Sequence, residues 1–188
     1  MTGYATLFAA LTAMGAFVAI PIGPVPIVLQ NLFVMLAGLL LGHRWGLASV
    51  GIYLLAGICG LPVFAGGQSG IGRLVGPTGG YLVGYLPAVY AIGRLAERSN
   101  HRAVVDIAAM TLGTLLLYAC GVSWLKLVTG LTWVKALAAG MLPFLIGDAL
   151  KIAAAVPIAR TLRPVIQSGV AGEQPARVKP AGTAGSNS

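Results

Sequence analysis

Long apolar runs fill most of the chain, and each run ends at a glycine, a proline or a short group of charged residues. Each run covers, or nearly covers, the ~20 apolar residues that a helix needs to cross the hydrocarbon core of a bilayer. The expected helices comprise residues 5–20, 27–41, 47–61, 79–95 and 104–120, and a last one that begins between 133 and 143 and ends near 159. The pattern therefore predicts an all-α, multi-pass integral membrane protein with six transmembrane helices.

Composition excludes a soluble fold. Of the 188 residues, 57% are hydrophobic and only 9% are charged, whereas a soluble domain carries ~25% charged residues on its surface. Residues 1–165 are expected to form one six-helix membrane domain. Residues 166–188 are rich in glycine, alanine, proline and serine and hold too little apolar surface to fold. We expect them to form a disordered cytoplasmic tail.

The basic residues predict the orientation in the membrane, because lysine and arginine are enriched in cytoplasmic loops. With a cytoplasmic N-terminus, eight basic residues lie inside and three lie in outer loops. The inner residues are Arg44, Arg94, Arg98, Arg102, Arg160, Arg163, Arg177 and Lys179, and the outer ones are Arg73, Lys126 and Lys135. Both termini are therefore expected in the cytoplasm. The net charge of +8 then reports topology and does not indicate a nucleic-acid partner.

Asp148 and Lys151 are the strongest candidates for chemistry, because both fall within the last expected helix. At positions i and i+3 they share one face of that helix. Ionisable residues inside a membrane span are costly and usually face the bundle interior or a cavity. The pair could simply neutralise itself and lock the helix in register. We favour a site for a polar ligand, whose donors and acceptors would complete the hydrogen bonds of both charges.

A glycine-rich outer loop, about residues 63–78, is the second candidate. Glycine allows sharp turns and close approach of the backbone to a ligand, and the segment GPTGG at 76–80 opens a helix whose first N–H groups are free. Arg73 is the only charge in this loop. It could grip a carboxylate or be a solvated loop residue. The glycine spacing matches no nucleotide-binding pattern.

Small and amide side chains give weaker signals. Ala9 and Ala13 form a small-xxx-small pair, which suits close packing either within the bundle or against a partner helix. Gln30 and Asn31 place two amides at the start of the second expected helix, where they could cap the helix, bond between helices or contact a ligand. Asp106, near the start of the fifth expected helix, is expected to pair with Arg102, four residues earlier. The sequence contains no nucleophile–base arrangement, metal-ligand cluster or Walker motif, so we expect neither an enzyme nor a bound metal or nucleotide.

Four segments together resemble one known family. They are residues 24–31 (PVPIVLQN), 60–67 (GLPVFAGG), 76–81 (GPTGGY) and 147–151 (GDALK). In order and spacing they resemble the BioY family, the biotin-binding S components of energy-coupling-factor (ECF) transporters. The resemblance covers about residues 5–160.

The resemblance implies the six-helix S-component fold, with biotin held near the outer face under the loops that follow the first, third and fifth helices. It implies that Asp148 and Lys151 contact the ligand. It also implies that Ala9 and Ala13 dock on a transmembrane coupling protein, which works with ATPase subunits in the cytoplasmic membrane. No cofactor beyond the ligand itself is implied.

The chemistry of biotin suits these residues, since biotin combines a ureido ring, an apolar thiophane ring and a carboxylate. We expect Asp148 to accept a hydrogen bond from a ureido N–H. Lys151 or Arg73 would face the carboxylate or the ureido oxygen, and these polar assignments could be reversed. The other expected ligand contacts are Gln30, Phe64, Gly66, Gly67, Thr78, Tyr81 and Trp124.

The predicted function is high-affinity capture and uptake of biotin as the substrate-binding subunit of an ECF-type ABC transporter. An S component for a different vitamin is an alternative, since one fold can host different ligands. An intramembrane enzyme and a purely structural subunit are alternatives from other classes. The sequence leaves open whether the energising module is dedicated or shared, and the oligomeric state.

Overall fold

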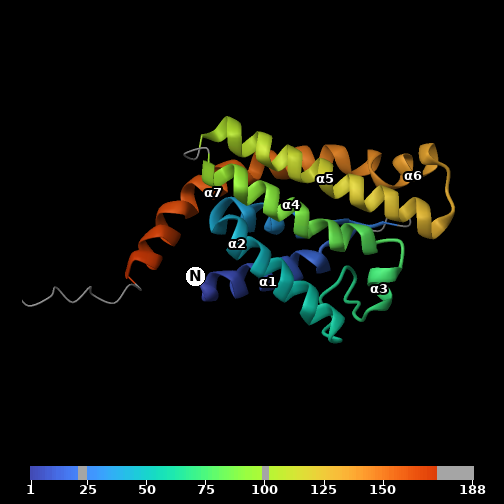
Figure 1. The fold of residues 1–188 in the computed structure, drawn as a ribbon, viewed down its shortest axis with the longest axis horizontal. Coiled ribbons are helices and arrows are strands. Elements are labelled where there is room, and N and C mark those ends of the chain that lie inside the picture. The colour runs from blue at the N-terminus through green and yellow to red at the C-terminus, as the bar shows by residue number, and fades with distance from the viewer. Residues whose placement is uncertain (21–24, 99–101, 173–188) are drawn as a thin grey trace, which may run out of the picture.

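The computed structural model describes residues 1–20, 25–98 and 102–172. Helices dominate it (Figure 1). They are α1 (Thr2–Phe17), α2 (Gln30–Ile58), α3 (Gly72–Val75), α4 (Gly79–Arg98), α5 (Ala103–Thr129), α6 (Trp133–Gly140) and α7 (Leu142–Gly172). Two short strands, β1 (Ala19–Ile20) and β2 (Ile27–Val28), pair antiparallel between α1 and α2.

Helix α2 is a hairpin of two helical legs that meet at Gly42, where φ is 75° and ψ is −178°. A Cβ built at Gly46 would lie 3.4 Å from the carbonyl oxygen of Ala37. In a straight helix, residues nine positions apart are separated by about 13 Å, so the chain folds back at Gly42. The legs, residues 30–41 and 43–58, correspond to the second and third expected helices.

The described part of the chain thus contains six long helical segments, α1, the two legs of α2, α4, α5 and α7, besides the short α3 and α6. This confirms the all-α prediction and the six helices. By length and composition, Ala103–Thr129 and Trp133–Ile166 are able to cross a membrane, Gln30–Ile58 also meets these criteria when its two legs are counted together, and α1 is a shorter apolar helix.

Glycines allow the helices to approach closely. A Cβ at Gly80 of α4 would lie 2.7 Å from the carbonyl oxygen of Cys120 on α5, and a Cβ at Gly15 of α1 would lie 2.9 Å from the Cα of Gln30 on α2. The hydrophobic effect does not drive helices together in lipid. Small residues at such crossings instead allow tight van der Waals packing, which stabilises the contact. The glycine-rich composition therefore serves helix contacts as well as loops.

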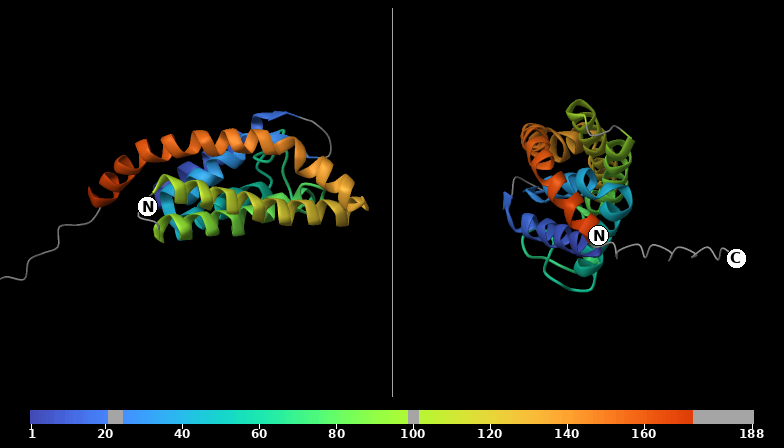
Figure 2. Two further views of the ribbon diagram at one scale, coloured as in Figure 1. Left: turned by 90° about the horizontal axis from the view of Figure 1, so that it is seen from above. Right: turned by 90° about the vertical axis from the view of Figure 1, so that its left-hand side faces the viewer.

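The two ends of the bundle differ. The N-terminus, the bend at Gly42, the end of α4 and the start of α5 lie at one end, and α3 and α6 lie at the other (Figure 1). Helix α7 runs along one side of the bundle, and its last turns continue beyond the other helices (Figure 2). Residues 166–172 are thus helical, where a tail was expected. Residues 173–188, the rest of the expected tail, lie outside the described residues.

Two local expectations differ from the structure. Helix α5 continues nine residues beyond the expected end at Cys120, to Thr129, and stops where Gly130 adopts a left-handed conformation with φ of 69°. The expected pairing of Asp106 with Arg102 is wrong, because Asp106 Oδ2 forms an ion pair with Arg163 Nη1 of α7 at 2.9 Å. Arg102 only precedes α5, at the N-cap position.

We expect Gly80→Ala to lower the melting temperature of the purified protein by several degrees, because its Cβ would meet a backbone carbonyl that cannot move aside. Gly51→Ala is the matched control, since a Cβ there meets nothing within 4 Å and alanine is the better helix former. Its melting temperature should be unchanged or higher. Equal melting temperatures for the two variants would contradict the close contact of α4 and α5.

Candidate functional site

A cavity of about 580 Å³, including its opening to solvent, lies among the start of α2, the loop that follows α2, and helices α4, α5 and α7. Small-molecule sites usually measure ~300–1,000 Å³ and are mostly apolar with a few placed polar groups. The lining residues are Val25, Pro26, Val28, Gln30, Asn31, Phe64, Ala65, Arg73, Thr78, Tyr81, Leu82, Tyr85, Leu117, Tyr118 and Phe144. Size and lining both suit a ligand with an apolar body.

The glycine-rich loop supplies one apolar wall. Gly66 and Gly67 have φ of 74° and 72° and turn the chain so that the Phe64 N–H donates to the Gln68 carbonyl at 2.9 Å. The Phe64 ring fills the space that a side chain at Gly57 would occupy. Phe64 lines the cavity. Gly66 and Gly67 lie outside the lining and act by shaping the turn.

Tyr81 of α4 supplies another part of the wall. Its hydroxyl donates to the Gly140 carbonyl at 2.6 Å, and its ring lies against Gly121, where no Cβ would fit. Two glycines on two helices therefore fix the orientation of the ring.

Trp124 and Thr78 flank the segment that leads into α4. The Trp124 indole N–H donates to the Gly76 carbonyl at 3.0 Å, and Trp124 remains 37% exposed. It lies outside the cavity lining and holds this segment against α5. Thr78 lines the cavity directly.

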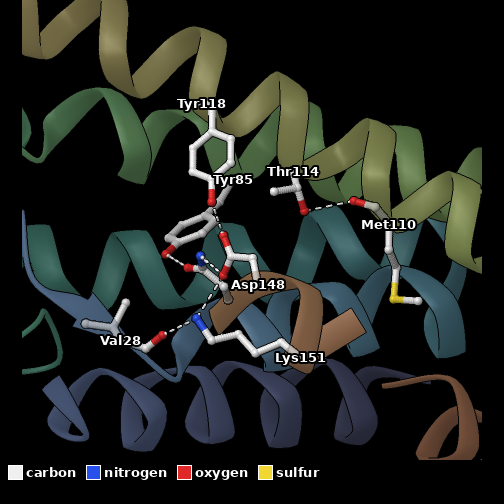
Figure 3. A network of polar contacts seen from close by, with 8 residues as sticks. Val28, Tyr85, Met110, Thr114, Tyr118, Asp148 and Lys151 are labelled. Carbon is white, nitrogen blue, oxygen red and sulfur yellow. Dashed lines mark hydrogen bonds and ion pairs between the residues drawn. The ribbon is translucent and has the colours of Figure 1, made fainter. Parts of the chain in front are cut away.

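A network of polar side chains around Asp148 and Lys151 lies at the inner side of the cavity (Figure 3). The Asp148 carboxylate accepts hydrogen bonds from Lys151 Nζ at 2.9 Å, from Asn31 Nδ2 at 3.5 Å and from the Tyr118 hydroxyl. Lys151 also donates to the Val28 carbonyl at 2.8 Å. Asp148 is 2% exposed and Lys151 9%. Both charges are thus partnered, as their burial requires.

The network places Asp148 and Lys151 directly behind the cavity wall, because Asn31 and Tyr118 line the cavity and contact Asp148. The Tyr85 hydroxyl extends the network by donating to Asn31 Oδ1. Sequence reasoning missed both tyrosines. One signal was present, since Tyr85 follows the expected site residue Tyr81 by four positions and so shares its face of α4.

Arg73 lines the cavity from α3 and is half-buried. Among the described residues, no carboxylate forms an ion pair with it. Its guanidinium is therefore available to an anionic group. Gln30 lines the cavity from the start of α2.

The remaining sequence candidates lie on α1. Ala9 is buried against the core with 5% exposure, and Ala13 is partly buried. Ala10 and Met14 are the exposed neighbours on this helix. As for metals, the described residues contain no cluster of three or more histidine, cysteine or carboxylate side chains.

Known proteins with similar sequences belong to one family. A model of the BioY family matches residues 2–168. The chain is 42% identical over 157 residues to a probable biotin transporter BioY of Pyrococcus horikoshii, covering 84% of this chain and 92% of that protein. It is 41% identical over 159 residues to the biotin transporter BioY of Thermotoga maritima, covering 85% and 93%.

A solved structure is also similar. It is a crystal structure of the S component for biotin from an ECF-type ABC transporter, with a TM-score of 0.81 and 34% sequence identity, covering 86% of this chain and 89% of that one. Fold, family model and relatives agree, and the chain belongs to the BioY family.

Proposed function

We propose that this protein captures biotin outside the cell and serves its uptake as the substrate-binding subunit of an ECF-type ABC transporter. The observation that carries the proposal is the cavity with apolar walls, a carboxylate network at its inner side and Arg73 in its lining, which pairs with no carboxylate of the described residues. The relatives are named as biotin transporters, and the similar structure is a biotin S component. The protein is a transport subunit, not an enzyme.

Asp148 is the proposed acceptor for a ureido N–H. Its two oxygens already accept from Asn31, Tyr118 and Lys151. A ureido donor would take over the place of the long contact from Asn31, and the freed Asn31 amide could then donate to the ureido oxygen. Exchange of partners keeps the buried carboxylate satisfied in both the empty and the occupied states.

Arg73 is the proposed partner of the biotin carboxylate. Lys151 is the other cation near the cavity, but it lies outside the lining and is already bonded to Asp148 and to the Val28 carbonyl. Arg73 lines the cavity and has no carboxylate partner among the described residues. Phe64 and Tyr81 would enclose the thiophane ring, while Gln30 and Thr78 offer further hydrogen bonds.

The proposed orientation places both termini in the cytoplasm of a bacterial-type cell, with the protein in the cytoplasmic membrane. Its support is the shared position of the Gly42 bend, the end of α4 and the start of α5 (Figure 1), which bring Arg44, Arg94, Arg98 and Arg102 to one end. Cytoplasmic loops are enriched in such residues. The cavity and the glycine-rich loop would then face outward.

The proposed partners are a transmembrane coupling protein and ATPase subunits, because the sequence contains no Walker motif to use ATP itself. The coupling protein would dock on α1. Ala9 has little surface left to offer, so Ala13 and its exposed neighbours Ala10 and Met14 would form the contact.

Binding of labelled biotin, thiamine and riboflavin to the purified protein in lipid nanodiscs tests the ligand. Biotin should bind saturably at one site, and an excess of either other vitamin should leave its binding unchanged. Preferential binding of thiamine or riboflavin would show an S component for another vitamin, and binding of none of the three would overturn the proposal.

Asp148→Asn should weaken biotin binding more than tenfold, because the amide loses the charge that accepts the ureido N–H and pairs with Lys151. The measurement is equilibrium binding on the monodisperse fraction. Glu97→Gln is the matched control, since it makes the same carboxylate-to-amide change outside the cavity. Near-normal biotin affinity in Asp148→Asn would contradict the role of Asp148 as acceptor for the ureido N–H.

Arg73→Gln should weaken binding of biotin roughly tenfold or more, since a hydrogen bond to a charged group contributes about 1.5–3 kcal/mol. Binding of biotinamide, which has no carboxylate charge, should change little. Lys126→Gln is a control at another cation, which lies over the Trp133 ring at 4.8 Å and outside the cavity lining. An equal loss of affinity for biotin and biotinamide in Arg73→Gln would refute the pairing of Arg73 with the biotin carboxylate.

A further inference from the structure

Helix α7 faces the bundle with an unusual set of side chains. Its buried residues recur every three or four positions and are Phe144, Asp148, Lys151, Ala155, Ala159, Arg163 and Ile166. Three of these carry charge and two are alanines. In the span Trp133–Ile166, which comprises α6 and most of α7, only 22% of the most apolar stretch is buried, against 61% for α2 and 39% for α5. Apolar packing alone therefore holds α7 weakly, and the partners of its charges decide where it lies.

The charges form two anchors at different heights on the helix. The outer anchor is the network of Asp148 and Lys151 at the cavity. The inner anchor is Arg163, about 22 Å further along the helix, whose Nη1 lies 2.9 Å from Asp106 Oδ2 on α5. Asp106 is completely buried. In the described part of the chain, its carboxylate has no hydrogen bond or ion pair with any other side chain.

The inner anchor also reaches the bend of α2. In a continuous helix the His43 N–H would donate to the Leu39 carbonyl, but here it donates to Glu97 Oε1 at 3.0 Å. The break leaves the Leu39 carbonyl without its helical donor. Arg163 Nη2 lies 3.5 Å from that oxygen, so one guanidinium connects α7 to α5 and to the first leg of α2. That leg begins with Gln30 and Asn31, in the cavity wall.

We propose that Asp106 and Arg163 are positioning residues for the biotin site: they fix the height and rotation of α7 on α2 and α5, so that Asp148 meets Asn31 and Tyr118. This inference rests on the proposed function. The segment between the anchors specifies the register only weakly. Its fully buried side chains, Ala155 and Ala159, present only methyl groups to the bundle, and its larger apolar side chains, Ile152, Val156 and Ile158, are only partly buried against the core. Pro157 also removes a backbone hydrogen bond from the helix.

Biotin affinity of Asp106→Asn in nanodiscs tests the proposal, and Lys126→Gln serves as the control, because Lys126 lies over the Trp133 ring and takes part in neither anchor. Asp106→Asn should bind biotin at least tenfold more weakly, with Lys126→Gln unchanged. Wild-type affinity in folded Asp106→Asn would overturn the inference. Failure of the wild-type protein itself to bind biotin would instead overturn the proposed function.

A double-mutant cycle separates positioning from general destabilisation. If Asp106 acts through Asp148, adding Asp106→Asn to Asp148→Asn should weaken binding by less than threefold. If the double variant instead loses biotin affinity by the product of the two single-variant factors, the inference is overturned. If Asp106→Asn does not fold, Arg163→Lys decides, because lysine retains a charge for Asp106 but cannot also reach the Leu39 carbonyl. We expect severalfold weaker binding there, and wild-type affinity would again overturn the inference.

Discussion

The need to partner every charge inside an apolar bundle is the constraint on which the rest of this structure depends. An ionised side chain in the membrane is costly unless it is paired and hydrogen-bonded. The Asp148 carboxylate meets this requirement with donors from three helices, Asn31 on α2, Tyr118 on α5 and Lys151 on α7. One carboxylate therefore joins three helices, and it does so directly behind the wall of the cavity.

Glycines determine how closely the helices pack, whereas a few polar residues provide the hydrogen-bonding groups of the cavity. Glycines such as Gly80 and Gly121 bring helices and rings into close contact, while glycines with positive φ shape the loop that carries Phe64. These choices create an apolar cavity with polar groups at its inner side and Arg73 in its lining. Such a cavity suits a ligand whose body is apolar and whose two ends carry directed hydrogen-bonding groups, and biotin has this form.

The sequence predicted what depends on local pattern and missed what depends on packing. The apolar runs predicted six helices, and the break at Gly42 was visible because Gly42, His43 and Arg44 end one run. The pairing of Asp106 was wrong because helical spacing favours Arg102, whereas the tertiary partner Arg163 lies 57 positions away. The roles of Tyr85 and Tyr118 could not be predicted for the same reason, since they arise only when α4 and α5 meet α2 and α7.

A crystal structure of the protein with bound biotin tests the central claim most directly. The account predicts density for the vitamin inside the cavity, with a ureido nitrogen within hydrogen-bond distance of the Asp148 carboxylate, the thiophane ring between Phe64 and Tyr81, and the carboxylate on Arg73. Biotin bound elsewhere, or in the cavity with Asp148 still separated from it by Asn31 and Tyr118, would contradict the account.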